Sequence, residues 1–350
     1  MTTTLQAASA VPMLSQEAIK AMYRDLSEFE RPDRRKAIWQ VCNSFLPYFA
    51  MWALMIYTAT QGYSYWITLS IGILTTPFWV RMFIIFHDCC HGSFFNSHKA
   101  NRFFGYLAGV LTFTPYEDWQ RSHAGHHATS GNLDRRGLGD IWTATVAEYR
   151  ALPWHKRAFY RLYRNPFVMF GVGPSVIMLG LQRLWHPGAR KRERVSVMIT
   201  NASILAIMVA AYLTFGIGSY IAIQLPIVLL AGAVGVWLFY VQHQFDGADW
   251  VRHDEWDQVR AALQGSSYYK LPSWLQWCTG NIGLHHIHHL RPGIPNYNLQ
   301  QCYDETPLMQ SVTPLTLRRS LRSVRQNLWD EKQGRLVSFG ELRSLPVEAS

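Results

Sequence analysis

A long stretch without any charged side chain constrains this chain most strongly. From Ala37 to Val80 there is no Asp, Glu, Lys or Arg, and a polar break at residues 61–64 divides the stretch in two. Two further apolar stretches follow near residues 195–215 and 219–241, separated by an uncharged turn. A membrane-crossing helix needs about 20 apolar residues. We therefore predict an all-α membrane protein whose four transmembrane helices cover about residues 40–60, 66–86, 195–215 and 219–241.

Two other apolar segments are weaker candidates for crossings. Residues 103–114 are only about half as long as a span requires. Residues 167–185 contain Gly and Pro, and basic residues stand at both ends. Positive charge at both ends argues against a crossing, because Lys and Arg collect on the cytoplasmic side. We expect both segments to be re-entrant or interfacial.

The charge distribution favours a membrane location over nucleic-acid binding. Hydrophobic residues make up 49% of the chain, and the formal net charge is +10. The Lys and Arg residues mainly flank the apolar blocks, as the positive-inside rule predicts. We expect cytoplasmic segments at residues 1–36 and 309–350, with a membrane domain at 37–308 and no removable signal peptide. The spacing of four arginines predicts a basic amphipathic helix, which would face lipid headgroups or an acidic electron donor: Arg318, Arg319, Arg322 and Arg325.

Histidines occur in three clusters beside these apolar stretches. The spacings H-x-x-x-H, H-x-x-H-H and H-x-x-H-H supply eight imidazoles: His87, His91, His123, His126, His127, His285, His288 and His289. Imidazole suits iron, zinc and copper, whereas magnesium and calcium prefer oxygen. Eight ligands exceed the needs of one ion, so two metals are indicated. Side chains at i, i+3 and i+4 share a helix face, so we expect each cluster to aim its rings at one point. Such histidines must be neutral, so we expect activity to fall below about pH 6.

The five cysteines indicate neither disulfides nor a zinc ribbon. They form an odd set without a C-x-x-C pair. Cys89 and Cys90 lie inside the first histidine cluster and could add ligands, but the histidines already suffice.

The motifs around these clusters carry a family resemblance. They are F-H-D-C-C-H-G-S-F at 86–94, W-Q-R-S-H-A-G-H-H at 119–127, Y-V-Q-H-Q-F at 240–245 and G-N-I-G-L-H-H-I-H-H at 280–289, with P-N-Y-N at 295–298. Over residues 39–308 the chain resembles the membrane-bound fatty acid desaturases, specifically the bacterial acyl-lipid type. The resemblance implies a di-iron centre of two Fe²⁺ ions, cytoplasmic like both termini, in the bacterial inner membrane. It also implies that dioxygen and two electrons remove two hydrogens from a membrane lipid acyl chain.

The resemblance assigns roles to further residues. The eight clustered histidines would be iron ligands, and His243 would be a ninth. Residues expected to orient the ligands are Asp88, Gln242, Asp246 and Asn281, with Asp249 and Asp254 as further candidates. His286 falls outside the H-x-x-H-H spacing and is expected to be an orienting or spare residue, as are His98, His155, His186 and His253. Electrons would come from a separate donor such as ferredoxin, flavodoxin or a b-type cytochrome with its reductase.

Two other functions remain open at this stage. A related di-iron hydroxylase or carotenoid-modifying oxygenase would carry similar clusters. A membrane metal-ion transporter would also place histidines near spanning helices, although transport sites usually lie within the spans. The sequence does not specify the position of the double bond, the acyl carrier, the electron donor or the oligomeric state.

Overall fold

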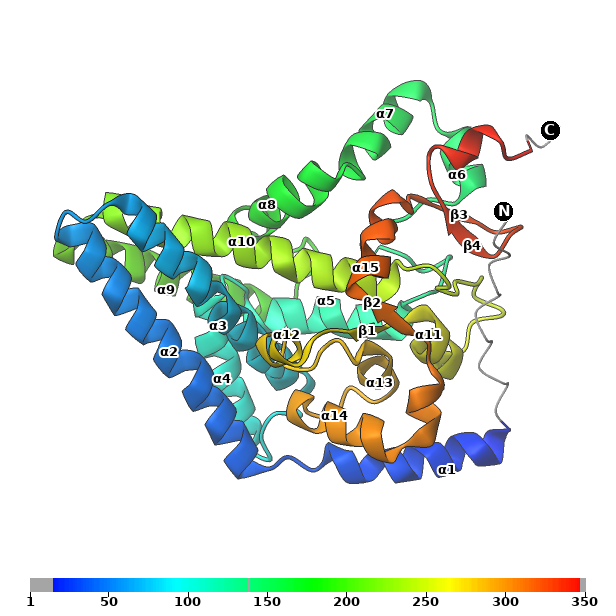
Figure 1. Ribbon diagram of the computed structural model, residues 1–350, viewed down its shortest axis with the longest axis horizontal. Coiled ribbons are helices and arrows are strands. Elements are labelled where there is room, and N and C mark those ends of the chain that lie inside the picture. The colour runs from blue at the N-terminus through cyan, green and yellow to red at the C-terminus, as the bar shows by residue number, and fades with distance from the viewer. Residues whose placement is uncertain (1–14, 138, 347–350) are drawn as a thin grey trace.

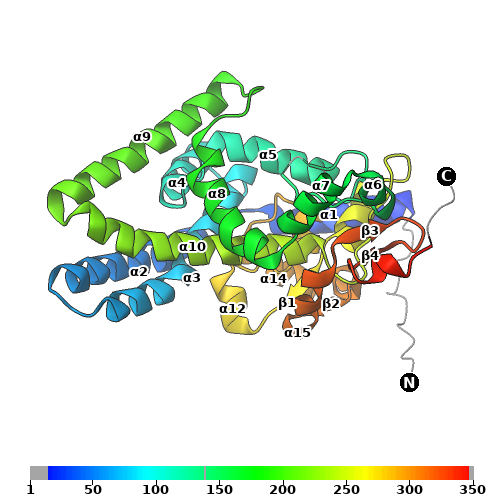
Figure 2. The same cartoon turned by 90° about the horizontal axis from the view of Figure 1, so that it is seen from above.

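The computed structural model describes residues 15–137 and 139–346, and it confirms the predicted all-α membrane class. Within this part of the chain, four helices are long and apolar enough to cross a membrane: α2 (Arg34–Thr60), α3 (Tyr65–His91), α9 (Lys191–Thr214) and α10 (Ile217–His243). They form two hairpins, and both hairpin turns lie at the left end of the molecule in Figures 1 and 2. Most of the remaining elements gather at the other end, in a layer that we call the cap.

Two of the spanning helices continue past their predicted C-terminal ends. Helix α3 continues past residue 86 to His91, and α10 continues past residue 241 to His243. Neither extension contains Gly or Pro, and α3 ends only where Gly92 adopts a left-handed conformation with φ of 72°. The histidines at these ends therefore stand on rigid helices that rise directly from the membrane region.

The four helices differ in how much surface they leave for lipid. Helix α3 is the most enclosed and packs against α2, α10 and α4 (His98–Leu111). The outer faces of α2 and α9 instead carry exposed apolar side chains such as Leu46, Phe49, Leu205 and Leu213. Apolar surface of this kind is stable only against lipid or another apolar partner.

The two weaker apolar segments form short helical elements. Residues 103–114 fall mainly in α4, which lies against α3 and α9. Residues 167–185 form η2 (Phe167–Val172), α8 (Gly173–Leu179) and η3 (Leu181–Arg183). This stretch bends by 59° from α7 (Trp154–Tyr163), and the pair would count as a fifth crossing only if both parts formed one span. That residues 167–185 do not cross stays a prediction.

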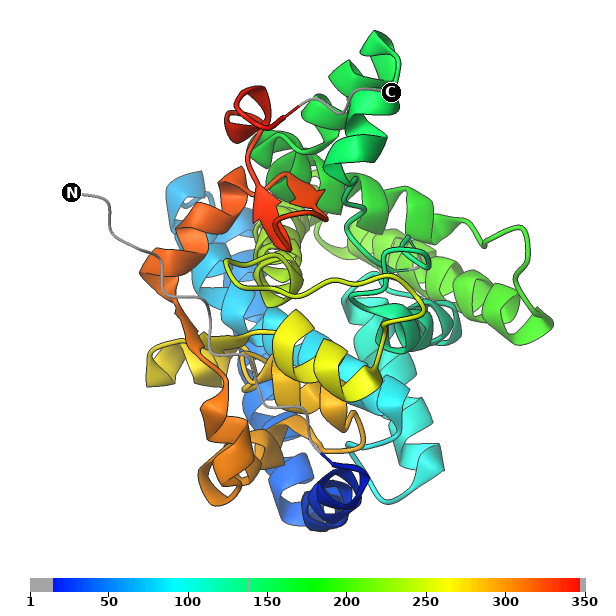
Figure 3. The same ribbon diagram turned by 90° about the vertical axis from the view of Figure 1, so that its right-hand side faces the viewer.

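The cap consists of short helices and two small sheets, and Figure 3 views it end-on. Its remaining elements are α1 (Gln16–Leu26), η1 (Ser27–Glu30), α5 (Tyr116–Thr129), α6 (Val146–Ala151), α11 (Gln258–Gly265), β1 (Tyr268–Lys270), α12 (Ser273–Cys278), α13 (His285–Leu290), α14 (Asn296–Glu305), η4 (Pro307–Ser311), β2 (Pro314–Thr316), α15 (Leu317–Ser320), η5 (Leu321–Arg325), β3 (Leu328–Asp330), β4 (Arg335–Val337) and η6 (Glu341–Arg343). Strands β1 and β2 pair in parallel, with Tyr269 opposite Leu315, and β3 and β4 form an antiparallel pair.

The terminal segments pack onto this cap. Ser15 caps α1 by accepting a hydrogen bond from the Ala18 amide, and Met22 and Leu26 of α1 join the core around α13. At the other end, Trp329 of β3 is fully buried. The four arginines at 318–325 lie on α15 and the 3-10 turn η5, so the predicted single amphipathic helix is interrupted. Residues 1–14 and 347–350 of the predicted terminal segments lie outside the described residues.

Candidate metal centre

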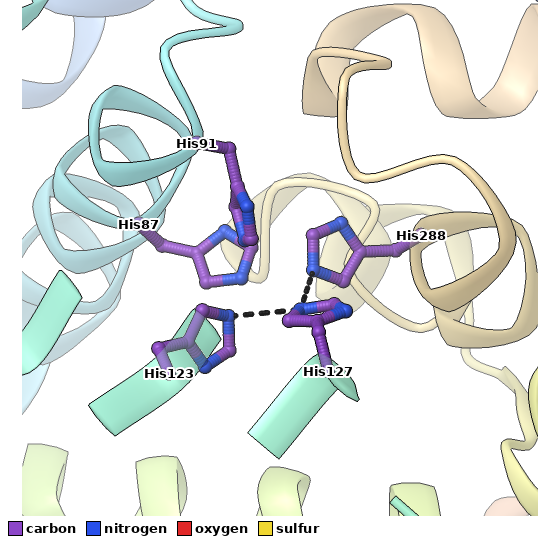
Figure 4. Close-up of side chains that lie close together, drawn as sticks. All are labelled: His87, His91, His123, His127 and His288. Atoms are coloured by element: carbon purple, nitrogen blue, oxygen red, sulfur yellow. Dashed lines mark hydrogen bonds between the residues drawn. The ribbon is translucent and has the colours of Figure 1, made fainter. Parts of the chain in front are cut away.

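The structure brings all nine predicted histidines together in two adjacent groups. The five-histidine group contains His87, His91, His123, His127 and His288, and the four-histidine group contains His126, His243, His285 and His289. Within each group one nitrogen from every ring lies within 4.8 Å of the others. Figure 4 shows the five-histidine group, whose rings point inward from three separate helices. Segments that are far apart in the sequence thus meet at one place, as the predicted metal centre required.

The first cluster aims at one point, because His87 and His91 both enter the five-histidine group, but for the second and third clusters that prediction was wrong. On α5, His123 and His127 enter the five-histidine group while His126 enters the other. On α13, His285 and His289 enter the four-histidine group while His288 enters the other. At about 100° per residue, i and i+4 diverge by only about 40°, whereas i+3 lies about 60° away on the opposite side. Each helix therefore sends an i, i+4 pair to one group and the i+3 ring to the other.

The spacing of the ring nitrogens fits a shared ion. The Nε2 atoms of His123 and His127 are 3.1 Å apart, and those of His127 and His288 are 3.0 Å apart. In the other group, Nε2 of His126 lies 3.1 Å from that of His243. Two nitrogens that each bind one ion at about 2.1 Å are separated by about 3.0 to 3.4 Å. The residues present therefore fit two metal ions, one in each group.

Burial keeps five of these imidazoles neutral. It lowers the pKa of His123, His127, His285, His288 and His289 well below 6.5, with neighbouring histidines adding to the effect. A buried polar atom normally has a partner, yet the Nε2 atom of His91 has none among the described residues. A neutral ring with a free nitrogen lone pair is the form that binds a metal.

One carboxylate orients the five-histidine group, as predicted for Asp88. Its Oδ1 lies 2.9 Å from Nδ1 of His87. A carboxylate only accepts, so Nδ1 carries the proton and Nε2 faces the group. The other oxygen, Oδ2, accepts from the backbone amide and side-chain amide of Asn296, at 2.7 and 2.8 Å. Asp88 is thus fixed by the P-N-Y-N segment that follows the third cluster.

The sequence analysis missed the residues that orient the four-histidine group. Asp140 bonds Nδ1 of His126, and the hydroxyl of Ser130 lies 3.2 Å from Nδ1 of His243. Both stand in the loop after α5, where Gly137 and Gly139 have positive φ. The sequence signal that could have identified Asp140 is a carboxylate in the glycine-rich segment that follows the second cluster.

Other residues expected to orient ligands lie elsewhere. Gln242 donates to the Ile282 carbonyl, and Asn281 donates to the Asn296 carbonyl, so Asn281 reaches the group only through Asn296 and Asp88. Asp246 is half-exposed and lies 4.0 Å from Arg319, and Asp249 pairs with Arg260.

The remaining candidates also lie outside the groups. His286 points away from them, because its Nε2 lies 3.1 Å from the Met309 carbonyl oxygen. Burial lowers the pKa of His286 to about 4. Cys89 and Cys90 are buried but belong to neither group, and neither do Asp254, His98, His155, His186 and His253.

Aromatic rings cover one histidine of each group. Trp119 stacks on His123 with ring centroids 4.2 Å apart, and Phe239 packs against His126 at 4.9 Å. Beside the four-histidine group, a cavity of about 30 Å³ is lined by His243, Asp140 and Phe239 among others. A space of this size holds a water molecule or a diatomic gas, but not a lipid chain.

Comparison with known proteins identifies the kind of enzyme that carries such a centre. A family model described as fatty acid desaturase matches residues 60–311. A fatty acid desaturase of Bacillus subtilis (strain 168) is 45% identical, covering 94% of this chain and 93% of its own length. An sn-1 acyl-lipid omega-3 desaturase (ferredoxin) of Synechocystis is 28% identical over 65% of this chain and 63% of its own length. An sn-1 oleoyl-lipid 12-desaturase of Picosynechococcus is 26% identical, with 68% and 69% covered.

Proposed function

The chain belongs to the fatty acid desaturase family, and we propose that it desaturates the acyl chain of a membrane lipid with a di-iron centre held by the two histidine groups. In the net reaction, two hydrogens leave adjacent methylenes, dioxygen accepts them with two electrons and two protons, and two molecules of water form. The observation that carries the di-iron proposal is the convergence of nine imidazoles into two groups, each with nitrogens within 4.8 Å.

The proposed ligands are the nine histidines of the two groups. When bound, iron supplies the redox chemistry with dioxygen that an unactivated C–H bond requires and that amino acid side chains lack. Neutral imidazoles suit iron better than they suit magnesium or calcium. The carboxylates Asp88 and Asp140 remain outside the groups and act on the rings of His87 and His126.

The protein's own residues prepare the site in two ways. Asp88 and Asp140 hold a proton on Nδ1 of their histidines, which directs Nε2 to the metal and raises its basicity. Trp119 and Phe239 cover the rings and exclude bulk water from the reacting groups. Exclusion of water protects reactive species from side reactions.

The membrane setting supports the proposed substrate, and the name of one relative supports the proposed class of electron donor. Two of the histidine-bearing helices, α3 and α10, are candidate spans, so an acyl chain dissolved in the bilayer lies beside the centre. We propose the bacterial inner membrane, with the cap and both termini cytoplasmic. A separate donor such as ferredoxin, flavodoxin or a b-type cytochrome supplies the electrons, and the relative named for ferredoxin supports this class.

Two measurements test the proposal. Elemental analysis of the purified protein should give two iron atoms per chain. Gas chromatography of lipids from expressing cells should reveal a new alkene. Zinc in place of iron would overturn the di-iron centre, and hydroxylated products without an alkene would identify a hydroxylase instead.

A further inference from the structure

A second cavity lies on the membrane side of the cap, apart from the histidine groups. Its volume is about 620 Å³, in the range of ligand-binding pockets. Its walls come from the spans α2 and α3 and from cap elements β1, α12 and α14. Nothing in the proposed chemistry uses this space.

The charged side chains that line the cavity are all positive. Three cations line the cavity, Lys36, Arg81 and Lys270, and no carboxylate is among the described residues of its wall. The neutral residues include amide side chains such as Gln40, Asn43 and Asn296. The lining is therefore suited to an anion with hydrogen-bond acceptors.

Arg81 is the most informative of these cations, because it stands inside α3 and is only 4% exposed. Its guanidinium contacts neutral groups: it donates to Ser44 Oγ at 3.2 Å, to Asn43 Oδ1 at 2.9 Å and to the Trp277 carbonyl. It also lies 3.9 Å from the Trp277 ring. These contacts leave two of its five N–H donors without a partner in the wall.

A buried charge without a counterion is costly, and an ionisable residue within a spanning helix usually marks a functional site. An anion inside the cavity would supply the missing charge. Arginine and lysine together recognise phosphate, arginine through paired N–H donors and lysine as a point charge.

The position of the cavity selects a lipid phosphate. Two walls are spanning helices, so a molecule in the bilayer reaches the cavity by lateral movement. The exposed indoles of Trp39 and Trp274, on α2 and α12, flank this region, and tryptophans of this kind collect at the depth of lipid headgroups. A phosphodiester belongs at the same depth.

We propose that this cavity binds the phosphodiester of a membrane glycerophospholipid through Lys36, Arg81 and Lys270. The inference rests on the proposed function, because it names the acyl carrier of the same reaction. The cavity shares Asn296 with the metal centre, since Asn296 lines it and also holds Asp88, which orients His87. Two hydrogen-bonded residues, Asn296 and Asp88, would thus separate a bound headgroup from His87 of the five-histidine group.

The test measures lipid binding without turnover. Purified full-length protein in neutral detergent receives phosphatidylglycerol or diacylglycerol with identical acyl chains, and native mass spectrometry determines the retained lipid. We expect the parent to retain the phospholipid preferentially and Lys270→Gln to bind it about tenfold more weakly, the loss of one charge-assisted contact. Arg81→Gln should weaken it further, provided that thermal unfolding shows the variant to be folded. Lys270 is exposed, so its substitution does not depend on that check.

A matched control separates this site from general attraction to anionic lipid. Lys191→Gln removes the same charge from a second basic hollow, lined also by Arg102 and Arg192, and should bind like the parent. Equal retention of diacylglycerol, or parental binding by Lys270→Gln, would overturn the proposal. Retention of an acyl-CoA thioester by a protein that fails to retain phospholipid would also overturn it. If phospholipid binds specifically but no lipid is desaturated, the proposed binding site would be supported and the proposed function would be overturned.

Discussion

The two histidine groups share helices but differ in how they are supported. The five-histidine group takes His87 and His91 from the end of α3, and Asp88 of the same helix orients it from a fully buried position. The four-histidine group relies on Asp140 and Ser130 from the loop after α5, and the Asp140 side chain is 17% exposed. The small cavity beside Asp140 lies at this second group.

This difference separates a group that a helix supports from a group that a loop supports. A helix that continues out of the membrane fixes the first group, whereas a loop with three positive-φ glycines holds the second. Loops open more readily than packed helices. We infer that the support of the four-histidine group loosens first, and the predictions below test how far the two groups differ.

The largest effect should come from removing a ring. His126→Ala leaves three imidazoles in the four-histidine group, whereas His91→Ala leaves four in the other. We expect both variants to lose desaturation, because the reaction needs both metals. Metal content should fall from two to about one per chain in His126→Ala and fall less in His91→Ala. Elemental analysis of membrane-inserted protein measures this, and normal activity in either variant would refute its assignment as a ligand.

The second-largest effect should come from substituting the carboxylates that orient the ligands. Asp88→Asn and Asp140→Asn should each lower metal affinity or activity by about 10- to 100-fold, the usual effect of residues behind a ligand. Asp88→Asn should have the larger effect, because Asp88 also accepts two hydrogen bonds from Asn296. Competition with a chelator would measure the affinities. A larger loss for Asp140→Asn would reverse the comparison between helix and loop.

Acid should destabilise the metal-free protein through both groups. Burial holds the pKa of His123 and His127 in one group, and of His285 and His289 in the other, well below 6.5. The unfolded chain binds protons near pH 6.5 while the folded rings do not, so stability is complete above that pH and falls as the pH drops below it. Thermal unfolding of chelator-treated protein between pH 8 and 5 would show a falling Tm. A Tm independent of pH would mean that the rings are not held neutral.

The smallest effect should come from the histidine that belongs to neither group. His286→Gln can keep a hydrogen bond to the Met309 carbonyl through its side-chain amide. We expect unchanged metal content and a stability change within about 1.5 kcal/mol, the value of one hydrogen bond. Since His286 lies directly beside His285 on α13, it is also the control for non-specific damage to that helix. Loss of metal in His286→Gln would mean that the boundary of the four-histidine group is wrong.

Local patterns predicted the elements that depend only on neighbouring residues. Uncharged stretches identified four spans, because the bilayer admits no other arrangement of so long an apolar backbone. The ends of α3 and α10 were placed too early, since hydropathy marks where lipid contact ends and not where the helix does.

Contacts between distant segments could not be predicted in the same way. Asp140, Ser130 and Asn296 reach the metal centre only through the packing of α5, α10 and α14. No spacing rule connects Asn296 with Asp88, because the backbone path between them crosses the membrane region and the cap. The binding role that we propose for the buried Arg81 likewise depends on the cavity, whose wall α2 and α12 complete.

The sequence alone determined that eight imidazoles stand at helical spacings beside four spans, because periodicity and hydropathy are properties of the local chain. Tertiary structure decided how those rings are shared. Helices α5 and α13 approach from different directions, so His123 and His127 meet His288 while His285 and His289 meet His126. A metal site is defined by where side chains converge in space, and that convergence depends on the packing of all the helices at once.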